Sequence, residues 1–386
     1  MYNNFIKLNK ILKGSKLDEP LSKHTFLKIG GPADLYYETV TSDELINAYK
    51  NAISFKVPVT ILGWGSNILV SDKGVRGLVI VNLSKQIKIL DSSNQKININ
   101  KPTSRWESDK SKGTFKYEFK DLDYTEEGSE RIDVRVDSGV GLSDAREDLF
   151  KYGITGLQWY AGIPGTIGGA VFNNIHGGTH FLSEVIKSVK VVTPEGEVKE
   201  LTISEIGVDY DKSRFHKSKE IIVSVLFSLY LGDVDKAKYV TSEWEKRKNI
   251  QPRNSPGCAF QNITQEQKTK LGFPTTSVGF IVEHELKMTD FRVGDAAVSA
   301  NHHNFIVNLG HATASDYLKV VKEIYRRTKK KLGIELVPEI FFLGFEDDEI
   351  KEFKTNEQIS LRKARRRDIK TVYGDSKKLF SKKASC

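Results

Sequence analysis

Apolar and polar positions along the chain predict short strands and several helices that follow no regular strand–helix alternation. Residues 186–203 alternate around the turn sequence Pro194-Glu195-Gly196, which is typical of a β-hairpin. Residues 221–231 form a strongly β-prone run, and residues 314–332 predict a long helix with Ser315 near its start and Gly333 just beyond its end. Strands and helices mixed in this way favour an α+β fold over a doubly wound sheet.

The N-terminal part of the chain predicts a set of strands around one helix. From Leu35 to Leu83 the order is strand, helix, strand, glycine-rich turn, strand, turn and strand. Ser42 is expected to cap the helix, since acidic residues follow it in the first turn. The β-rich run at residues 57–62 ends at Gly63, so a glycine-rich turn directly follows a strand. Much later, a charged helix is expected to run to Asn249.

Two segments differ in composition from the rest of the chain. Residues 92–130 are polar, which predicts an inserted hairpin. Residues 361–386 carry ten Lys and Arg side chains against two Asp, so this segment holds eight of the nine net positive charges. The remainder is nearly neutral, and basic tails are usually solvated, so we expect that no nucleic acid is required and leave the partner of the tail undefined.

The composition excludes several classes of protein. With 386 residues, 39% of them hydrophobic, the chain can form two or three domains with cores of their own, which excludes disordered and collagen-like proteins. No apolar run approaches the ~20 residues needed to span a bilayer, and the N-terminus lacks the apolar core of a signal peptide. The two cysteines, Cys258 and Cys386, do not make a disulfide framework. A cytoplasmic protein is therefore expected.

Two glycine-rich segments predict a site for a diphosphate. Glycine lets backbone N–H groups converge on an anion, and Ser and Thr hydroxyls add further donors. Neither segment is a Rossmann fingerprint, because Ile68 occupies the position of its last glycine, and the chain contains no P-loop motif. Neither contains Lys or Arg, so backbone amides are expected to do most of the binding. The candidate residues are Gly63, Gly65, Ser66 and Asn67 in the first segment, and Gly162, Pro164, Gly165, Thr166, Gly168, Gly169 and Asn174 in and after the second.

Beyond these loops, several motifs occur in an order that resembles the UDP-N-acetylenolpyruvoylglucosamine reductase (MurB) family. Two of them are Ser255-Pro256-Gly257-Cys258-Ala259-Phe260-Gln261-Asn262 and Leu336-Val337-Pro338-Glu339. The others lie within residues 24–34, 63–70, 161–174 and 297–305, so the resemblance extends from about residue 20 to residue 345.

The resemblance implies an α+β fold of the vanillyl-alcohol-oxidase type, in which two subdomains hold FAD and a third domain carries the substrate site. The two glycine-rich segments would then hold FAD, without a covalent bond, since no histidine lies in the first loop. On this basis the chain divides into FAD-binding subdomain 1 (1–85), FAD-binding subdomain 2 (86–235, with the polar insertion 92–130), a C-terminal substrate-binding α+β domain (236–345) and a charged, mostly basic tail (346–386).

The resemblance also implies the reaction. Members of this family use NADPH to reduce the enolpyruvyl double bond of UDP-N-acetylglucosamine enolpyruvate, giving UDP-N-acetylmuramate for peptidoglycan synthesis. FAD passes hydride from its N5 atom to the β-carbon, and the protein delivers a proton to the α-carbon. Such a site requires a proton donor and a group that stabilises the substrate carboxylate as it becomes enolate-like.

The resemblance assigns catalytic roles to three positions. Cys258 stands where the family has a serine proton donor, and a thiol is competent for the same step. Glu339 matches the glutamate near the enolpyruvyl carboxylate. Asp211 stands where the family has a catalytic arginine, and an aspartate cannot clamp a carboxylate. Arg214 or Lys212 are the substitutes that the sequence offers.

The substrate positions that the resemblance implies are Tyr210, Asn262 and His302. Arg247 and Lys248 are equally compatible with contact to the substrate diphosphate and with a solvated helix face. His176 and His180 lie close in sequence, but the glycines between them argue against a helical metal pair, and no metal is predicted.

Two other readings stay open at the level of sequence. One is an FAD-dependent oxidase of the same fold that acts on another substrate, which Asp211 would favour. The other is a catalytically weak relative whose basic tail binds RNA or another partner. The NADPH-dependent reductase accounts best for the motifs of the third domain.

Overall fold

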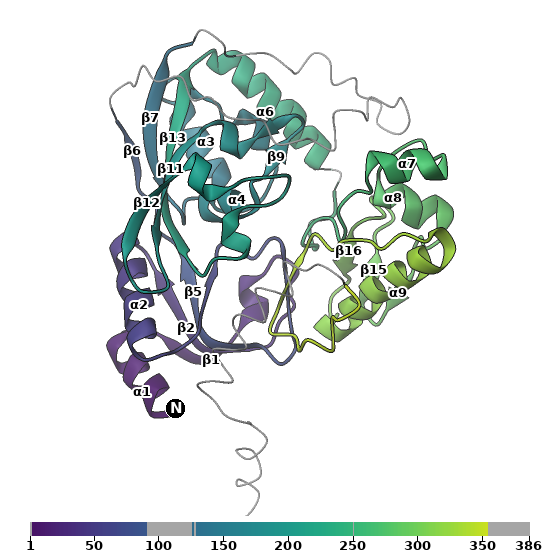
Figure 1. Cartoon of the computed structure of the whole chain (residues 1–386), viewed down its shortest axis with the longest axis horizontal. Coiled ribbons are helices and arrows are strands. Elements are labelled where there is room, and N and C mark those ends of the chain that lie inside the picture. The colour runs from purple at the N-terminus through teal and green to yellow at the C-terminus, as the bar shows by residue number, and fades with distance from the viewer. Residues whose placement is uncertain (1, 91–125, 127–128, 250, 354–386) are drawn as a thin grey trace, which may run out of the picture.

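The computed structural model describes residues 2–90, 126, 129–249 and 251–353, and these form a larger and a smaller lobe (Figure 1). Most of the predicted insertion at residues 92–130, and the whole basic run at residues 361–386, lie outside the described residues. None of the helices in the described part of the chain is long and apolar enough to cross a membrane.

The first sheet of the larger lobe has four strands in the order β1-β2-β5-β3. They are β1 (Lys16–Pro20), β2 (Pro32–Thr39), β5 (Val75–Asn82) and β3 (Val59–Leu62). All but β1 run parallel, and two helices, α1 (Tyr2–Ile11) and α2 (Ser42–Ser54), bury their apolar side chains with this sheet. Thr41 caps α2, one residue before the predicted cap, because it keeps an extended backbone and its hydroxyl accepts from the N–H of Glu44.

The second sheet of the larger lobe is antiparallel, in the order β12-β11-β13-β7-β6, with β8 on the end of β13. The strands are β6 (Ile87–Ile89), β7 (Arg131–Asp137), β8 (Ile154–Thr155), β11 (Ile186–Val192), β12 (Val198–Thr202) and β13 (Ile221–Leu231). The predicted hairpin at residues 186–203 and strand at residues 221–231 are confirmed. The helices that share the core of this sheet are α3 (Leu142–Phe150), α4 (Ile167–Asn173), α5 (Ile203–Ile206) and α6 (Val234–Lys248).

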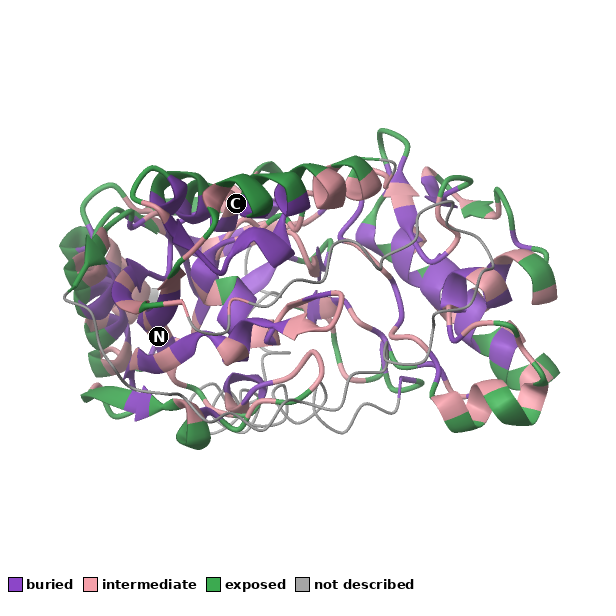
Figure 2. Cartoon of the chain, turned by 90° about the horizontal axis from the view of Figure 1, so that it is seen from above, coloured by how far each residue is buried: buried purple, intermediate pink, exposed green. Residues whose placement is uncertain are grey.

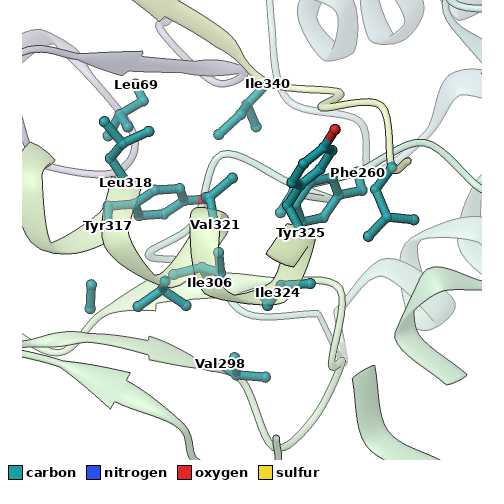
Figure 3. Close-up of a cluster of buried hydrophobic side chains, with 14 of the residues drawn as sticks. Leu69, Phe260, Val298, Ile306, Tyr317, Leu318, Val321, Ile324, Tyr325 and Ile340 are labelled. Atoms are coloured by element: carbon teal, nitrogen blue, oxygen red, sulfur yellow. The ribbon is translucent and has the colours of Figure 1, made fainter. Parts of the chain in front are cut away.

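The smaller lobe is built around one long helix, α9 (Ala314–Leu332), whose bounds match the prediction. Thr313 caps it in a reciprocal pair with Asp316, and Gly333 ends it in the left-handed conformation. One face of α9 enters the core shown in Figure 3, where Tyr317, Leu318, Val321, Ile324 and Tyr325 pack with side chains from other segments. The other elements of this lobe are α7 (Gln265–Leu271), α8 (Val278–Phe280), the short π-helical turn Ile281–Glu285, β14 (Arg292–Val293), β15 (Ala296–Val298) and β16 (Ile306–Asn308).

The two lobes are tied together by a pair of parallel strands. After α9, the chain returns to the larger lobe, and β17 (Phe341–Leu343) pairs with β4 (Ile68–Val70), the strand that follows the first glycine-rich segment. The carboxylate of Asp72 adds a second tie, since it accepts hydrogen bonds from the N–H groups of Ala314 and Ser315 at the start of α9, at 2.8 and 3.0 Å. Figure 2 shows that buried residues gather inside each lobe. The mixture of sheets and helices confirms the α+β class.

The folded part of the smaller lobe extends beyond the predicted domain end at residue 345. Ile350 and Phe353 are both buried in the core around α9. The ring of Phe353 stacks on Phe342 at a centroid distance of 5.4 Å and meets Tyr325 edge-on at 5.5 Å. The first residues of the predicted tail therefore belong to the C-terminal domain.

Candidate active site

The two glycine-rich segments lie against each other, although about a hundred residues separate them. The hydroxyl of Ser66 donates a hydrogen bond to the carbonyl oxygen of Pro164 at 2.8 Å. A Cβ atom at Gly63 would lie only 2.6 Å from Oγ1 of Thr166, so glycine is required for this close approach. Sequence reasoning predicted both segments, and the fold brings them into one structure.

Several backbone N–H groups in these segments are available to a ligand. Within the described residues, the N–H groups of Trp64, Gly65 and Ser66 donate no hydrogen bond, and neither do those of Gly165 and Thr166. Clustered N–H groups without a partner favour an anion such as a diphosphate. The donor set therefore fits the diphosphate of FAD.

A large cavity of about 1670 Å³ extends from these segments toward the smaller lobe. Single small-molecule pockets are commonly ~300–1,000 Å³, so this cavity has room for a cofactor and a second ligand together. Most of the residues predicted for the site line it, namely Gly63, Gly65, Ser66, Asn67, Gly162, Pro164, Gly165, Thr166, Gly168, Gly169, Tyr210, Asp211, Cys258, Asn262 and Glu339.

Cys258 and Glu339 are held side by side by backbone pairing. The N–H of Glu339 donates to the carbonyl oxygen of Ala259, the neighbour of Cys258, at 3.0 Å. The side-chain amide of Asn67 donates to the carbonyl oxygen of Glu339 at 3.3 Å, which connects this pair to the first glycine-rich segment. Two motifs separated by about eighty residues thus converge on one wall of the cavity.

Both groups hold their protons more tightly than usual. Burial raises the pKa of the Cys258 thiol well above its ordinary value, and the neighbouring Glu339 raises it further. Burial also raises the pKa of Glu339 well above its ordinary value, and the negative charge of Asp211 adds to this effect. The cavity wall therefore presents a protonated thiol beside a carboxyl group that binds its proton more strongly than a free glutamate does.

Asp211 faces the cavity from a tight turn. Its backbone is in the left-handed region, with φ of 49°, and across the turn the N–H groups of Asp209 and Lys212 each donate to the carbonyl oxygen of the other residue. Its carboxylate Oδ1 lies 3.2 Å from Nδ1 of His176, and the ring of His176 packs on Tyr210 at 4.9 Å between centroids. Asp211 is thus paired with a histidine beside the cavity.

Arg214 does not take the place of the missing arginine. Its guanidinium donates to the carbonyl oxygen of Glu205 and to the carboxylate of Glu220, both at 3.0 Å, and it does not line the cavity. Arg214 begins the short 3-10 turn Arg214–His216. Lys212 does line the cavity.

Lys248 lines the cavity at the last residue of α6, a position for which the sequence left a solvated face equally open. Its stem lies over the second glycine-rich segment, so that a Cβ atom at Gly162 would be 2.6 Å from Cβ of Lys248. Burial lowers the pKa of Lys248, while the nearby Cys258 and Glu339 oppose this shift. No sequence pattern signals this position, because it depends on how the end of α6 packs against a distant loop.

Besides Arg214, two predicted residues lie outside the cavity lining. Asn174 is fully buried, and its amide donates to the carbonyl oxygen of Asp209 while accepting from the N–H of Ser183, so it braces the loop that carries Asp211. His302 packs on Phe305 at 4.5 Å, and burial lowers its pKa to about 4. Its Nδ1 atom is buried and has no hydrogen-bond partner in the described part of the chain.

His176 and His180 do not converge on a common metal position. His176 pairs with Asp211, whereas His180 stacks on Trp159 at 3.8 Å and lies 3.5 Å from Glu184. Among the residues that the structure describes, no group of three or more His, Cys, Asp and Glu could hold a metal ion.

Comparisons with known proteins agree with this geometry. The family model for the C-terminal domain of UDP-N-acetylenolpyruvoylglucosamine reductase matches residues 250–343, and the model for an FAD binding domain matches residues 120–202. The UDP-N-acetylenolpyruvoylglucosamine reductase of Pediococcus pentosaceus is 32% identical over 331 residues, which cover 85% of this chain and 94% of that protein. The reductase of Caldanaerobacter subterraneus is 30% identical over 343 residues, covering 88% of this chain and 97% of that protein.

A solved structure supports the same conclusion. The crystal structure of UDP-N-acetylenolpyruvylglucosamine reductase (MurB) from Thermus caldophilus superposes with a TM-score of 0.60 at 27% identity, covering 85% of this chain and 98% of that one. The similarity in sequence and fold covers both lobes, so it includes the FAD-binding segments as well as the C-terminal domain. The chain therefore belongs to the UDP-N-acetylenolpyruvoylglucosamine reductase (MurB) family of FAD-dependent oxidoreductases.

Proposed function

We propose that this chain catalyses the NADPH-dependent reduction of UDP-N-acetylglucosamine enolpyruvate to UDP-N-acetylmuramate, a step in the synthesis of peptidoglycan precursors. The observation that carries the proposal is the backbone pairing that puts Cys258 and Glu339 on one cavity wall, tied by Asn67 to the first glycine-rich segment. Membership of the family supplies the substrate and the direction of the reaction.

The cofactor in this proposal is FAD, which when bound would accept hydride from NADPH and supply it to the β-carbon of the enolpyruvyl group. Backbone N–H groups of residues 64–66 and 165–166 would hold its diphosphate, and Ser66 and Thr166 add hydroxyl groups beside them. FAD is proposed to bind without a covalent bond. Release of the intact flavin when the protein is denatured would support this point.

Cys258 is proposed to deliver the proton. Reduction of the double bond requires a proton at the carbon beside the substrate carboxylate, and the C–H bond forms as the S–H bond breaks. Burial keeps this thiol protonated before the reaction. The sulfur regains its proton from water after product leaves.

Glu339 is proposed to stabilise the carboxylate end of the substrate. Burial and the charge of Asp211 raise the pKa of its carboxyl group, and in its protonated form this group can donate a hydrogen bond to an oxygen that gains negative charge. An ionised glutamate in the same position would instead repel the substrate. Tyr210 and Asn262 line the same cavity and are proposed to contact the UDP-sugar.

The test separates the two halves of the reaction. In anaerobic stopped-flow measurements, NADPH should bleach the flavin of the wild-type protein, and UDP-N-acetylglucosamine enolpyruvate should restore its absorbance. We expect Cys258→Ala to be reduced by NADPH at the wild-type rate but to form product ~10²–10⁴-fold more slowly. Cys258→Ser is the matched control and should retain much of the activity, because a hydroxyl group can serve the same role.

Two outcomes would contradict this proposal. Normal product formation by Cys258→Ala would remove the thiol from the reaction. If oxygen restores the absorbance of the bleached flavin and UDP-N-acetylglucosamine enolpyruvate does not, the result would favour the oxidase alternative.

The proposal includes a cytoplasmic location, where NADPH and nucleotide sugars are supplied, and a reaction that needs no nucleic acid. Residues 354–386 are accordingly expected to be dispensable for turnover, whatever their own partner is. The cavity supports this expectation, because among the described residues its lining ends at Leu343.

A further inference from the structure

The substrate carries a carboxylate, so the cavity needs a cation to bind it. At the position where the family has an arginine, this chain has an acid, Asp211. This inference deepens the proposed function and rests on it. A substrate with an enolpyruvyl carboxylate enters a space that already holds the side chains of Asp211 and Glu339. Several cations line the same cavity: Lys56, Lys212, Lys217, Lys219, Lys248 and Arg253.

Among these cations, Lys248 acts electrostatically on both Cys258 and Glu339. Lys248 lowers the pKa of the Cys258 thiol and that of the Glu339 carboxyl group, against the larger effect of burial. A charge that influences both groups must lie close to the wall that carries them. Its effect also extends to His302, the histidine that packs on Phe305 behind this wall.

The ammonium group of Lys248 is available to bind a ligand. Among the described residues it has no ion pair within 4 Å and no hydrogen bond. Its helical neighbour Lys246 differs, because its ammonium group lies 2.5 Å from the carboxylate of Glu243 on the exposed side of α6. Arg247, between them, packs its guanidinium over the ring of Trp244 at 5.3 Å.

The stem of Lys248 is fixed by the second glycine-rich segment. Cβ and Cγ of Lys248 lie 2.6 and 2.7 Å from the place where a side chain at Gly162 would begin, and Gly162 has φ of 76°. The lysine therefore extends directly over a loop that is built to hold the cofactor. This arrangement places the stem of Lys248 beside the cofactor segment, in the same cavity that Cys258 and Glu339 line.

We propose that Lys248 binds the enolpyruvyl carboxylate of the substrate, and that it replaces the arginine whose family position is occupied here by Asp211. The carboxylate of Asp211 already has a neighbour, because its Oδ1 atom lies 3.2 Å from Nδ1 of His176. Arg214 is held by Glu205 and Glu220 outside the cavity. The function of the arginine has thus moved from the turn at residues 209–212 to the end of α6.

The test compares two ligands that differ in the carboxylate. UDP-N-acetylmuramate carries a lactyl carboxylate, and UDP-N-acetylglucosamine has none. Their dissociation constants are measured by isothermal titration calorimetry on the FAD-loaded protein, without NADPH and without turnover. We expect Lys248→Met to weaken binding of UDP-N-acetylmuramate by about 10- to 100-fold, the value of a hydrogen bond to a charged group, and to leave UDP-N-acetylglucosamine within about twofold.

Two control variants make the comparison specific. Methionine keeps the stem that packs over Gly162, and equal FAD content with an unchanged melting temperature would show that Lys248→Met is folded. Lys246→Met, on the outer face of the same helix, should change neither affinity. Lys248→Arg should recover part of the affinity for UDP-N-acetylmuramate.

The outcomes distinguish the inference from the function on which it rests. An equal loss of affinity for both ligands would overturn it, because Lys248 would then contact the diphosphate or the sugar. No loss for either ligand would overturn it as well. A wild-type protein that binds neither nucleotide would instead refute the proposed function itself.

Discussion

The chemistry of the cavity depends on a few protonation states. Burial raises the pKa of the Cys258 thiol and that of the Glu339 carboxyl group, and it lowers the pKa of His302 to about 4, so this imidazole is neutral at neutral pH. An incoming carboxylate favours the charged form of a buried lysine, so Lys248 is the group whose charge best complements the substrate. The binding of an anion and the donation of a proton can therefore be assigned to different side chains.

At this scale, Glu339 should make stability depend on pH. Its pKa in the folded protein lies above the ordinary value of 4.5, so the folded protein keeps a proton that the unfolded chain has released. The free energy of unfolding therefore falls as pH rises from about 4.5 through the raised folded pKa. For the protein freed of FAD, we expect Glu339→Gln to melt like the wild type near pH 4.5 and a few degrees higher near pH 8.

Scanning calorimetry at both pH values checks this expectation, with Glu130→Gln, a change of an exposed carboxylate, as the control. A constant difference in melting temperature across the pH range would mean that Glu339 is ionised in the folded protein.

Site residues that belong to short sequence motifs were predicted well. Residues whose position depends on tertiary packing were predicted less well. Cys258 and Glu339 lie within short motifs whose spacing survives in this chain, and the fold brings both to the cavity. Arg214 was expected to serve from three residues away, but its guanidinium donates to Glu220 instead. For Lys248 the sequence left contact with the substrate and a solvated helix face equally open, because its surroundings come from Gly162, almost ninety positions earlier.

At the level of elements, the end of the smaller lobe was the least predictable part. The helix at residues 314–332 was predicted to the residue, because capping chemistry marks both of its ends. The burial of Ile350 and Phe353 was not predicted, because charged residues surround them and no periodic pattern includes them. Their contacts with α9 and β17 arise only in the tertiary structure.

Removal of this last segment should destabilise the protein. Phe353→Ala deletes a buried ring between Phe342 and Tyr325, and we expect it to lower the free energy of unfolding by about 3–5 kcal/mol. A chain that ends at Phe345 should lose at least as much stability, whereas one that ends at Phe353 should keep wild-type turnover. Urea unfolding followed by fluorescence measures these differences.

Lys351→Ala, at an exposed position between the two buried residues, is the matched control and should change stability little. Equal stability of the chains that end at residues 345 and 353 would show that Ile350 and Phe353 add nothing to the core.

For the whole molecule, the important contacts are those between the lobes. The cavity is lined from both lobes, so its shape depends on the β4–β17 pairing and on the hydrogen bonds from α9 to Asp72. The two-lobed arrangement could be predicted from the family resemblance, but these contacts could not, since each involves residues more than two hundred positions apart.

The tie at Asp72 can be tested directly. Asp72→Ala removes both acceptors at the start of α9 and should lower the free energy of unfolding by about 0.5–2 kcal/mol, the usual cost of a lost helix cap. Asp72→Asn keeps one carbonyl oxygen and should lose less. Urea titration of the three proteins gives the comparison, and equal stability of all three would show that this tie does not hold the lobes together.

The pairing of β4 with β17 also determines when the protein becomes an enzyme. Asn67 and Glu339 are joined by a hydrogen bond across 272 positions, and contacts of such long range close late in folding. A ribosome releases the first glycine-rich segment early, but its partner strand is among the last parts of the folded chain to be made. An incomplete chain therefore has the cofactor segment without Glu339 beside it. Completion of synthesis, closure of the fold and gain of reductase activity should therefore coincide.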